Sequence, residues 1–310
     1  MSTDLDKPYH SRLTINIFNN SGSFDEVQNT INSFKEIQFE NDHPCYIPTR
    51  PLREFFSEFI GTLIFITIGI GTVAQVTLSG ILKSPAGTFI STNWGFGFAI
   101  MIGMMVSGKI SGGHMNPAVT IAFAIFGKLK PWHKCFHYMF AQYLGAFFGS
   151  ALVYITYYEA FQEAGINIDT AKIFATYPAP HISAPGIVLD EFVGTALLLM
   201  SVCAIIDKKN LNIPAFFHPF LIGLVVFVIT MSFSFNAGAA LNPARDLGPR
   251  LFTAVFGWGL DPFSYAKHFW MTPILATHAG AIIGVLIYQT FIGWQLSLED
   301  QRTPNLIMNL

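Results

Sequence analysis

Six apolar runs dominate the chain, and each is long enough to cross a lipid bilayer as a helix. A helix pairs its backbone hydrogen-bonding groups internally, which hydrocarbon demands because it holds no water. The runs lack the alternating pattern of a membrane β-strand. We therefore expect an all-α membrane protein with transmembrane helices near Phe55–Ser79, Ile90–Ser107, Cys135–Tyr157, Ile187–Ile206, Phe220–Phe235 and Phe269–Ile292.

The composition agrees with extensive contact between the chain and lipid. Only 12% of the 310 residues are charged, whereas a soluble domain carries about 25%. The net charge of −2 supplies no basic surface for phosphates, so we expect no nucleic-acid partner. The runs contain no nucleophile–base pair and no cluster of metal ligands. We therefore expect no enzymatic activity, no cofactor and no metal site.

The two halves of the chain share three landmarks in the same order. The landmarks are Glu-Phe-x-Gly-Thr at 58–62 and 191–195, Gly-Ala-x-x-Gly at 145–149 and 280–284, and Asn-Pro-Ala at 116–118 and 242–244. Each half also holds three of the apolar runs. Because three is an odd number, the second half must lie upside down relative to the first. Inverted repeats with broken helices place their functional site near the bilayer midplane.

Each Asn-Pro-Ala segment is typical of a helix start, since Asn is a strong N-cap and Pro is favoured at the first helical position. The apolar stretches that follow, 118–126 and 247–256, are too short to span and predict re-entrant half-helices. The Gly-rich segments before them place extended backbone at membrane depth, which is tolerated only beside a polar cavity. The motif residues are Asn116, Pro117, Ala118, Asn242, Pro243 and Ala244.

These motifs resemble the aquaporin, or major intrinsic protein, family over roughly residues 53–294. Asp246 directly after Arg245, and the segment Thr-Tyr-Pro-Ala-Pro-His at 176–181, resemble its aquaglyceroporin branch. The resemblance implies an aquaporin-like fold of six transmembrane helices and two half-helices. It also implies a homotetrameric plasma-membrane channel that passes glycerol, water and other small neutral solutes and excludes protons and ions.

The expected domain organisation follows from the same resemblance. A channel domain at 51–294, with repeat one at 51–158 and repeat two at 186–294, lies between an N-terminal tail at 1–50 and a C-terminal tail at 295–310. Lysine and arginine concentrate at alternate connections, which predicts that both tails are cytoplasmic. Apolar residues recurring between residues 24 and 37 suggest a short helix that lies on the membrane or plugs the inner mouth. A loosely ordered tail is the alternative.

The resemblance also implies the residues of a selectivity filter, which are Trp94, Thr230, Ala239 and Arg245. Alanine at 239 and threonine at 230 depart from the bacterial glycerol facilitators, and the net expectation is a wider, less stereoselective opening that also admits urea. A membrane-interface anchor is the alternative role for Trp94. Backbone carbonyls are expected to form a ladder of acceptors along one wall, from Gly112, Gly113, His114, Gly238, Ala239 and Ala240. His114 is either a vestibule residue or a packed side chain.

Three acidic residues complete the predicted site, two inside apolar runs and one just after the second Asn-Pro-Ala motif, and each has two interpretations. Glu58 and Glu191 either relay protons, as in a coupled transporter, or accept backbone N–H bonds from the re-entrant loops. Their matched positions in the two repeats favour the second role. Asp246 either pairs with Arg245 or orients a neighbouring loop. A strictly water-selective pore and a secondary transporter are the competing functions.

Overall fold

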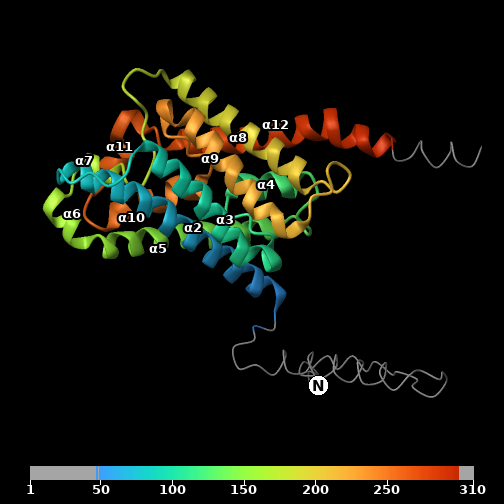
Figure 1. The fold of residues 1–310 in the computed structure, drawn as a ribbon, viewed down its shortest axis with the longest axis horizontal. Helices are drawn as coiled ribbons and strands as arrows, with labels where there is room; N and C mark the ends of the chain where they lie inside the picture. The colour runs from blue at the N-terminus through green and yellow to red at the C-terminus, as the bar shows by residue number, and fades with distance from the viewer. Residues whose placement is uncertain (1–46, 48, 300–310) are drawn as a thin grey trace, which may run out of the picture. The chain divides into compact units, whose positions relative to one another are not determined.

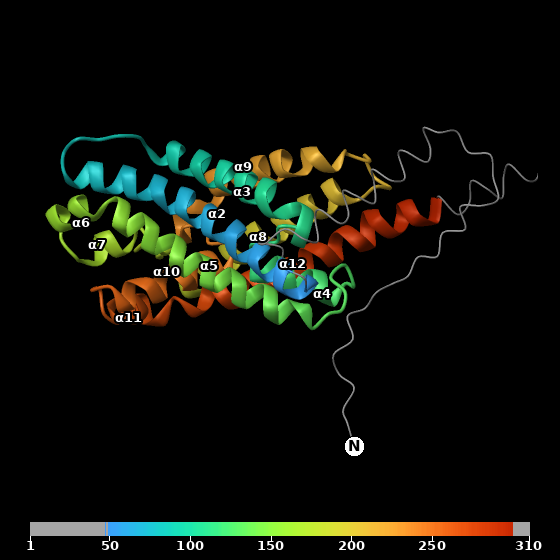
Figure 2. The same ribbon diagram turned by 90° about the horizontal axis from the view of Figure 1, so that it is seen from below.

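The computed structural model describes residue 47 and residues 49–299, and every regular element among them is a helix (Figures 1 and 2). Six of these helices are long and apolar enough to cross a membrane, as the sequence predicts. Their bounds are α2 (Arg50–Ile81), α3 (Phe89–Ser111), α5 (Lys134–Thr156), α8 (Ala184–Ile206), α9 (His218–Ala237) and α12 (Met271–Tyr288). The helix predicted between residues 24 and 37 lies outside the described residues.

The remaining elements are shorter. Two follow the Asn-Pro-Ala motifs as predicted, and they are α4 (Pro117–Ile125) and α10 (Pro243–Val255). The sequence pattern did not predict the others, because they are too short for an apolar period to develop. These are α6 (Tyr158–Ala164), α7 (Ile168–Ala171), α11 (Asp261–His268), the 3-10 turn η1 (Ala215–Phe217) and the π-helical turn η2 (Gln289–Gly293).

Helix α2 begins at Arg50, five residues before the predicted apolar run. Proline at the first turn suits a helix start, because the missing N–H would have no partner there. The first turns also carry Glu54, which is buried and accepts hydrogen bonds from Arg50 and Lys134, each at 2.8 Å. These paired charges interrupt the hydropathy of the helix without interrupting the helix itself.

The second half of the chain repeats the packing of the first. Helix α2 packs on α3 and α5, and α8 packs on α9 and α12. The shared glycines mark the equivalent crossings: a Cβ at Gly145 would overlap the carbonyl oxygen of Phe59, and one at Gly280 would overlap that of Phe192. Glycine is needed at both positions because the backbones of the paired helices touch there.

Helices α3 and α9 cross where the two halves meet (Figure 2). At this crossing Gly97 faces the carbonyl oxygen of Gly223, and Gly223 faces the carbonyl oxygen of Gly97. A reciprocal contact of this kind is what an internal two-fold relation between the halves produces. The half-helices follow the same rule, since α4 packs on α12 of the second half and α10 packs on α5 of the first.

Glycines in the left-handed conformation end α3 and α9, and the loops that lead to the half-helices begin there. Gly112 ends α3 with φ 93°, and Gly238 ends α9 with φ 90°. The loops that follow are not helical. Met115 and Leu241, which each precede a motif asparagine, also have positive φ values of 48° and 54°. Both loops therefore hold strained backbone at the same position relative to their half-helices.

Candidate pore

The two motif asparagines join the half-helices head to head. The Asn116 side-chain oxygen accepts the Ala118 N–H at 2.9 Å, and the Asn242 oxygen accepts the Ala244 N–H at 2.9 Å. Each amide nitrogen also donates to the opposite loop, Asn116 to the Leu241 carbonyl at 2.9 Å and Asn242 to the Met115 carbonyl at 2.8 Å. The capping prediction is thus confirmed. A side-chain amide has two N–H groups, so each asparagine keeps one beyond this cross-link.

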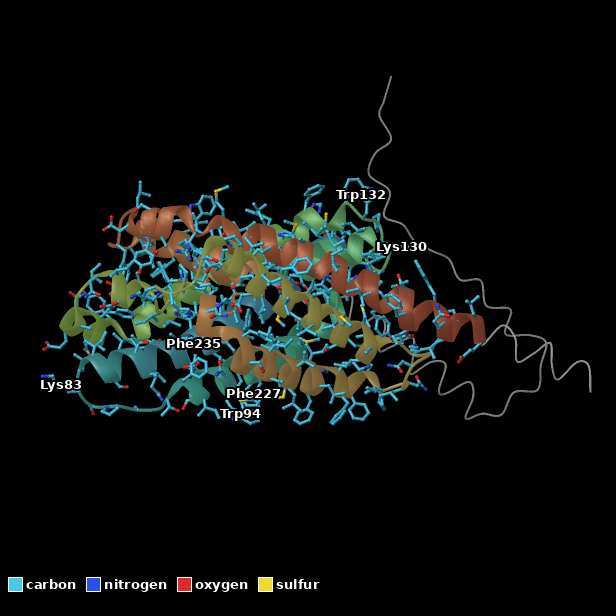
Figure 3. The ribbon with its side chains drawn as sticks, turned by 90° about the horizontal axis from the view of Figure 1, so that it is seen from above. Lys83, Trp94, Lys130, Trp132, Phe227 and Phe235 are labelled. Carbon is cyan, nitrogen blue, oxygen red and sulfur yellow. The ribbon has the colours of Figure 1, made fainter. Side chains whose placement is uncertain are left out.

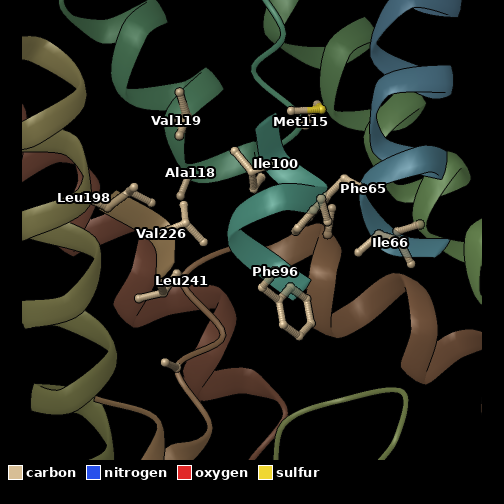
Figure 4. Packing of buried hydrophobic residues seen from close by; sticks show 14 of the residues in the cluster. Phe65, Ile66, Phe96, Ile100, Met115, Ala118, Val119, Leu198, Val226 and Leu241 are labelled. Atoms are coloured by element: carbon tan, nitrogen blue, oxygen red, sulfur yellow. The ribbon is translucent and has the colours of Figure 1, made fainter. Parts of the chain in front are cut away.

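Two cavities lie on opposite sides of this junction. The outer cavity, of about 420 Å³, contains Asn242 and Arg245 in its lining, and the inner cavity, of about 580 Å³, contains His114 and Lys130. Asn116 lines both cavities. Three apolar side chains, labelled in Figure 4, also line both cavities, namely Ile100, Leu198 and Val226. The two cavities therefore adjoin at a position, called the neck below, that is lined by a motif amide and by apolar side chains.

Both buried glutamates hold the re-entrant loops, as the scaffold interpretation predicts. Glu58 accepts the N–H groups of His114 and Met115 at 2.9 and 2.7 Å. Glu191 accepts those of Ala240 and Leu241 at 2.8 and 3.0 Å. Each carboxylate thereby satisfies the two backbone donors just before its motif asparagine, where no helix is available to pair them.

Further side chains bind Glu58. Ser111 donates its hydroxyl proton to Oε1 at 2.6 Å, and Gln142 donates to Oε2 at 2.8 Å. With the loop N–H groups, these bonds give the two oxygens four donors at a residue with no exposed surface. A carboxylate engaged in this way is fixed in place, which suits a structural anchor.

Arg245 projects from the first turn of α10 into the outer cavity. It is only 7% exposed, and it donates to the Phe174 carbonyl at 2.9 Å. Its guanidinium carbon lies 4.8 Å from the ring centroid of Phe96, a cation–π contact. Thr230 and Ala239 line the same cavity. The structure thus brings together three of the four predicted filter residues.

Trp94 is the fourth, and its prediction as a filter residue was wrong. Its side chain lies on the outer surface of α3, 38% exposed, where it stacks on Phe98 and Phe227 (Figure 3). Phe96 lines the outer cavity instead. Two residues rotate an α-helix by about 200°, so the two aromatic rings face opposite ways. Spacing along α3 does not separate the two rings, since Trp94, Phe98 and Met101 recur at helical intervals just as Phe89, Phe96 and Ile100 do.

Asp246 orients a loop rather than pairing with Arg245, so the second interpretation holds. Its carboxylate accepts the Thr176 N–H at 2.8 Å and forms an ion pair with Arg250 at 2.9 Å. Arg250 is 1% exposed and donates onward to the carbonyls of Thr176 and Pro262 at 2.6 and 2.7 Å. This network fixes the loop that covers the outer cavity.

The residues predicted to form the carbonyl ladder divide between the two cavities. Gly112, Gly113 and His114 line the inner cavity, whereas Gly238, Ala239 and Ala240 line the outer one. The His114 ring also packs against Phe123 and Tyr138, and its Nδ1 lies 3.1 Å from the Thr120 hydroxyl. His114 is therefore both a vestibule residue and a packed, hydrogen-bonded side chain.

The fold and the site define a class of multi-pass membrane proteins in which two re-entrant helices meet head to head. The sequence model described as "Major intrinsic protein" matches residues 48–288, so the chain belongs to the major intrinsic protein family. It is 44% identical to Aquaporin-9 of Mus musculus over 255 residues, which cover 80% of this chain and 85% of that relative. It is 39% identical to Aquaporin-10 of Homo sapiens over 247 residues, or 77% and 81% of the two chains.

A solved structure agrees with these relatives. The X-ray structure of the aquaglyceroporin from Plasmodium falciparum matches with a TM-score of 0.74 and 30% sequence identity, and the match covers 80% of this chain and 99% of that one. The family predicted from the two Asn-Pro-Ala motifs is thereby confirmed, as is the all-helical fold.

Proposed function

We propose that the chain is a passive channel for glycerol, water and other small neutral solutes, urea included. The observation that carries this proposal is the junction of the two cavities at the amides of Asn116 and Asn242. Relatives named aquaporins, and a structural neighbour described as an aquaglyceroporin, support the same class of solute. Members of this family are channels rather than enzymes.

The junction passes neutral molecules and opposes charged ones. Each half-helix directs its N-terminus, with a partial charge of about +0.5, toward the neck. A water molecule or hydroxyl group between the two amides accepts their N–H bonds, so it does not relay a proton along a chain of donors. Cations meet the same positive potential. Arg245 adds a full positive charge to the wall of the outer cavity.

The filter binds a polyol by presenting two unlike walls. Arg245 offers guanidinium donors to hydroxyl groups, while the Phe96 ring packs against the carbon edge of the solute. Ala239 supplies little bulk to the lining of the same cavity, and Thr230 adds a hydroxyl that already donates to the Val226 carbonyl at 3.0 Å. The resulting opening admits urea as well as glycerol.

A coupled transporter is the competing function, and the buried acids argue against it. The carboxylates of Glu58 and Glu191 hold backbone donors in both repeats, so neither is free to carry a proton from one cavity to the other. A series of weak carbonyl sites along the two cavities lets a solute enter without being held tightly, which suits a passive channel.

Swelling measurements on proteoliposomes test this function. We expect the purified protein to accelerate water, glycerol and urea flux, with a glycerol flux that stays linear in concentration and ignores ion gradients. A protein that passes water but neither glycerol nor urea would refute the solute assignment. Saturating flux that follows a proton or sodium gradient would instead identify a transporter.

The assembly and orientation extend this proposal. We infer a plasma-membrane homotetramer in which the tails at 1–50 and 295–310 are cytoplasmic and residues 51–294 form the channel domain with its two repeats. Lys128, Lys130 and Lys134 line the inner cavity, and the long axis of Figure 3 separates Lys130 from Lys83. This charge bias supports a cytoplasmic inner cavity. Chemical cross-linking in membranes and protease protection of a tagged tail test the two points separately.

A further inference from the structure

The outer cavity contains a buried polar group with no role in the pore as described above, the amide of Asn93 on α3. Asn93 is 2% exposed, and its Nδ2 has no hydrogen-bond partner within the described part of the chain. A buried donor left unpaired costs stability, so native proteins rarely retain one without a reason. Asn93 lines the outer cavity, where a passing molecule can satisfy that donor.

The position of Asn93 relative to the filter is set by the helix. Phe89, Asn93, Phe96 and Ile100 all line the outer cavity, at intervals of four, three and four residues that mark one helix face. Asn93 is therefore the polar member of a largely apolar stripe. It lies one turn outward from Phe96, a rise of about 4.5 Å along the axis, and the Phe96 ring is the one that stacks on Arg245.

The hydroxyl of Tyr177 is a second unpaired polar group in the same cavity. It is buried and has no hydrogen-bond partner among the described residues. Its ring lies 4.6 Å from the guanidinium carbon of Arg250, within the loop that Asp246 anchors. Burial raises the pKa of Tyr177 to about 12, against the lowering effect of Arg250, so the hydroxyl keeps its proton at neutral pH.

We propose that Asn93 and Tyr177 form an outer hydroxyl-binding subsite that selects solutes carrying a second hydroxyl group two carbons away from the first, as glycerol does. The proposal rests on the channel function above and adds to it a determinant of solute preference. A linear polyol whose leading hydroxyl contacts Arg245 places a hydroxyl two carbons behind at about the height of Asn93. The amide and the phenol then replace water on that trailing group as the solute enters the narrow part. Water and urea have no such group.

The test compares matched variants in proteoliposomes by stopped-flow swelling. Asn93→Leu removes the amide at similar side-chain volume, and Tyr177→Phe removes only a hydroxyl. Trp94→Phe is the control, since Trp94 is the next residue on α3 but faces outward. The solutes are water, urea, glycerol and 1,2-propanediol, which is glycerol without one terminal hydroxyl.

We expect Asn93→Leu to lower glycerol permeability about fivefold, the ratio that one net hydrogen bond gives. Water and urea permeability should stay within about twofold, and that of 1,2-propanediol should fall less than that of glycerol. Tyr177→Phe should act in the same direction, which keeps the test decisive if Asn93→Leu does not fold. Trp94→Phe should behave as the wild type.

Two results would overturn the subsite while leaving the channel intact. One is a glycerol-to-water permeability ratio unchanged in both variants. The other is a proportional fall in all four solutes in variants that are correctly folded, which would mean that the side chains only shape the cavity. A wild-type protein that conducts no glycerol would instead refute the proposed function, and the subsite with it.

Discussion

Replacing Glu58 with glutamine tests whether this buried carboxylate anchors the first re-entrant loop or relays protons. Its oxygens accept four hydrogen bonds, from Ser111, Gln142 and the backbone N–H groups of His114 and Met115. A glutamine side chain keeps one acceptor oxygen and places an NH2 group where the other oxygen was. Two of the four donor groups then face this NH2 group, which cannot accept their hydrogen bonds.

The expected loss of unfolding free energy is that of the less destabilising of the two amide orientations. If the NH2 group faces Ser111 and His114, the serine hydroxyl can rotate to accept a bond, but the His114 N–H has no alternative partner. The variant loses one hydrogen bond to a charged group and leaves one buried N–H unpaired, about 3 kcal/mol of unfolding free energy in total. For a chain of this size, the Tm should fall by roughly 5–10 °C.

Thermal unfolding in detergent provides the stability measurement, with Glu159→Gln as the matched control because Glu159 lies exposed on α6. The control should stay within about 0.5 kcal/mol of the wild type. Glycerol flux through folded Glu58→Gln protein should remain independent of a pH gradient. An unchanged Tm in this variant would refute the anchoring role. A wild-type flux that follows the pH gradient and loses this dependence in Glu58→Gln would establish the relay.

Three further predictions address the outer network, the helix crossings and the filter. Arg250→Met leaves the buried Asp246 carboxylate without its cation, at a cost of about 3–5 kcal/mol, so size-exclusion chromatography should show little folded protein; adding Asp246→Asn should recover part of it. Gly280→Ala forces α12 away from α8 and should lower the Tm, whereas Gly71→Ala, whose Cβ meets open space, should not. Phe96→Ala removes the aromatic wall of the filter and should raise urea permeability several-fold in swelling assays.

The long helices and the two half-helices were predictable because each depends on local sequence. Hydropathy alone identifies a spanning run. The asparagine before each proline is itself the N-cap of the half-helix, as the hydrogen bond from the Ala118 N–H to Asn116 shows. The roles of Glu58 and Glu191 were also accessible, because an acid repeated in both halves points to a shared structural task. The start of α2 at Arg50 was not accessible, since Glu54 is held inside in part by Lys134 of α5, a tertiary contact.

The filter shows where sequence reasoning failed. Trp94 and Phe96 are both aromatic and both lie on α3, so residue type does not separate them. Which ring faces the lumen depends on the rotation of the helix, and that rotation is set by packing such as the fit of Phe96 against Gly69. Asn93 was missed for a similar reason, because an amide in an apolar run looks unremarkable until its missing partner is seen.

The central claim is that the two motif amides lie where the outer and inner cavities adjoin, so that solutes pass beside them from one cavity to the other. A cryo-electron microscopy map of the protein in lipid nanodiscs, at a resolution that shows ordered water, tests it directly. The account predicts one file of water density passing within hydrogen-bonding distance of Asn116 and Asn242. Asparagines held far apart, or closed off from both cavities by protein density, would contradict it.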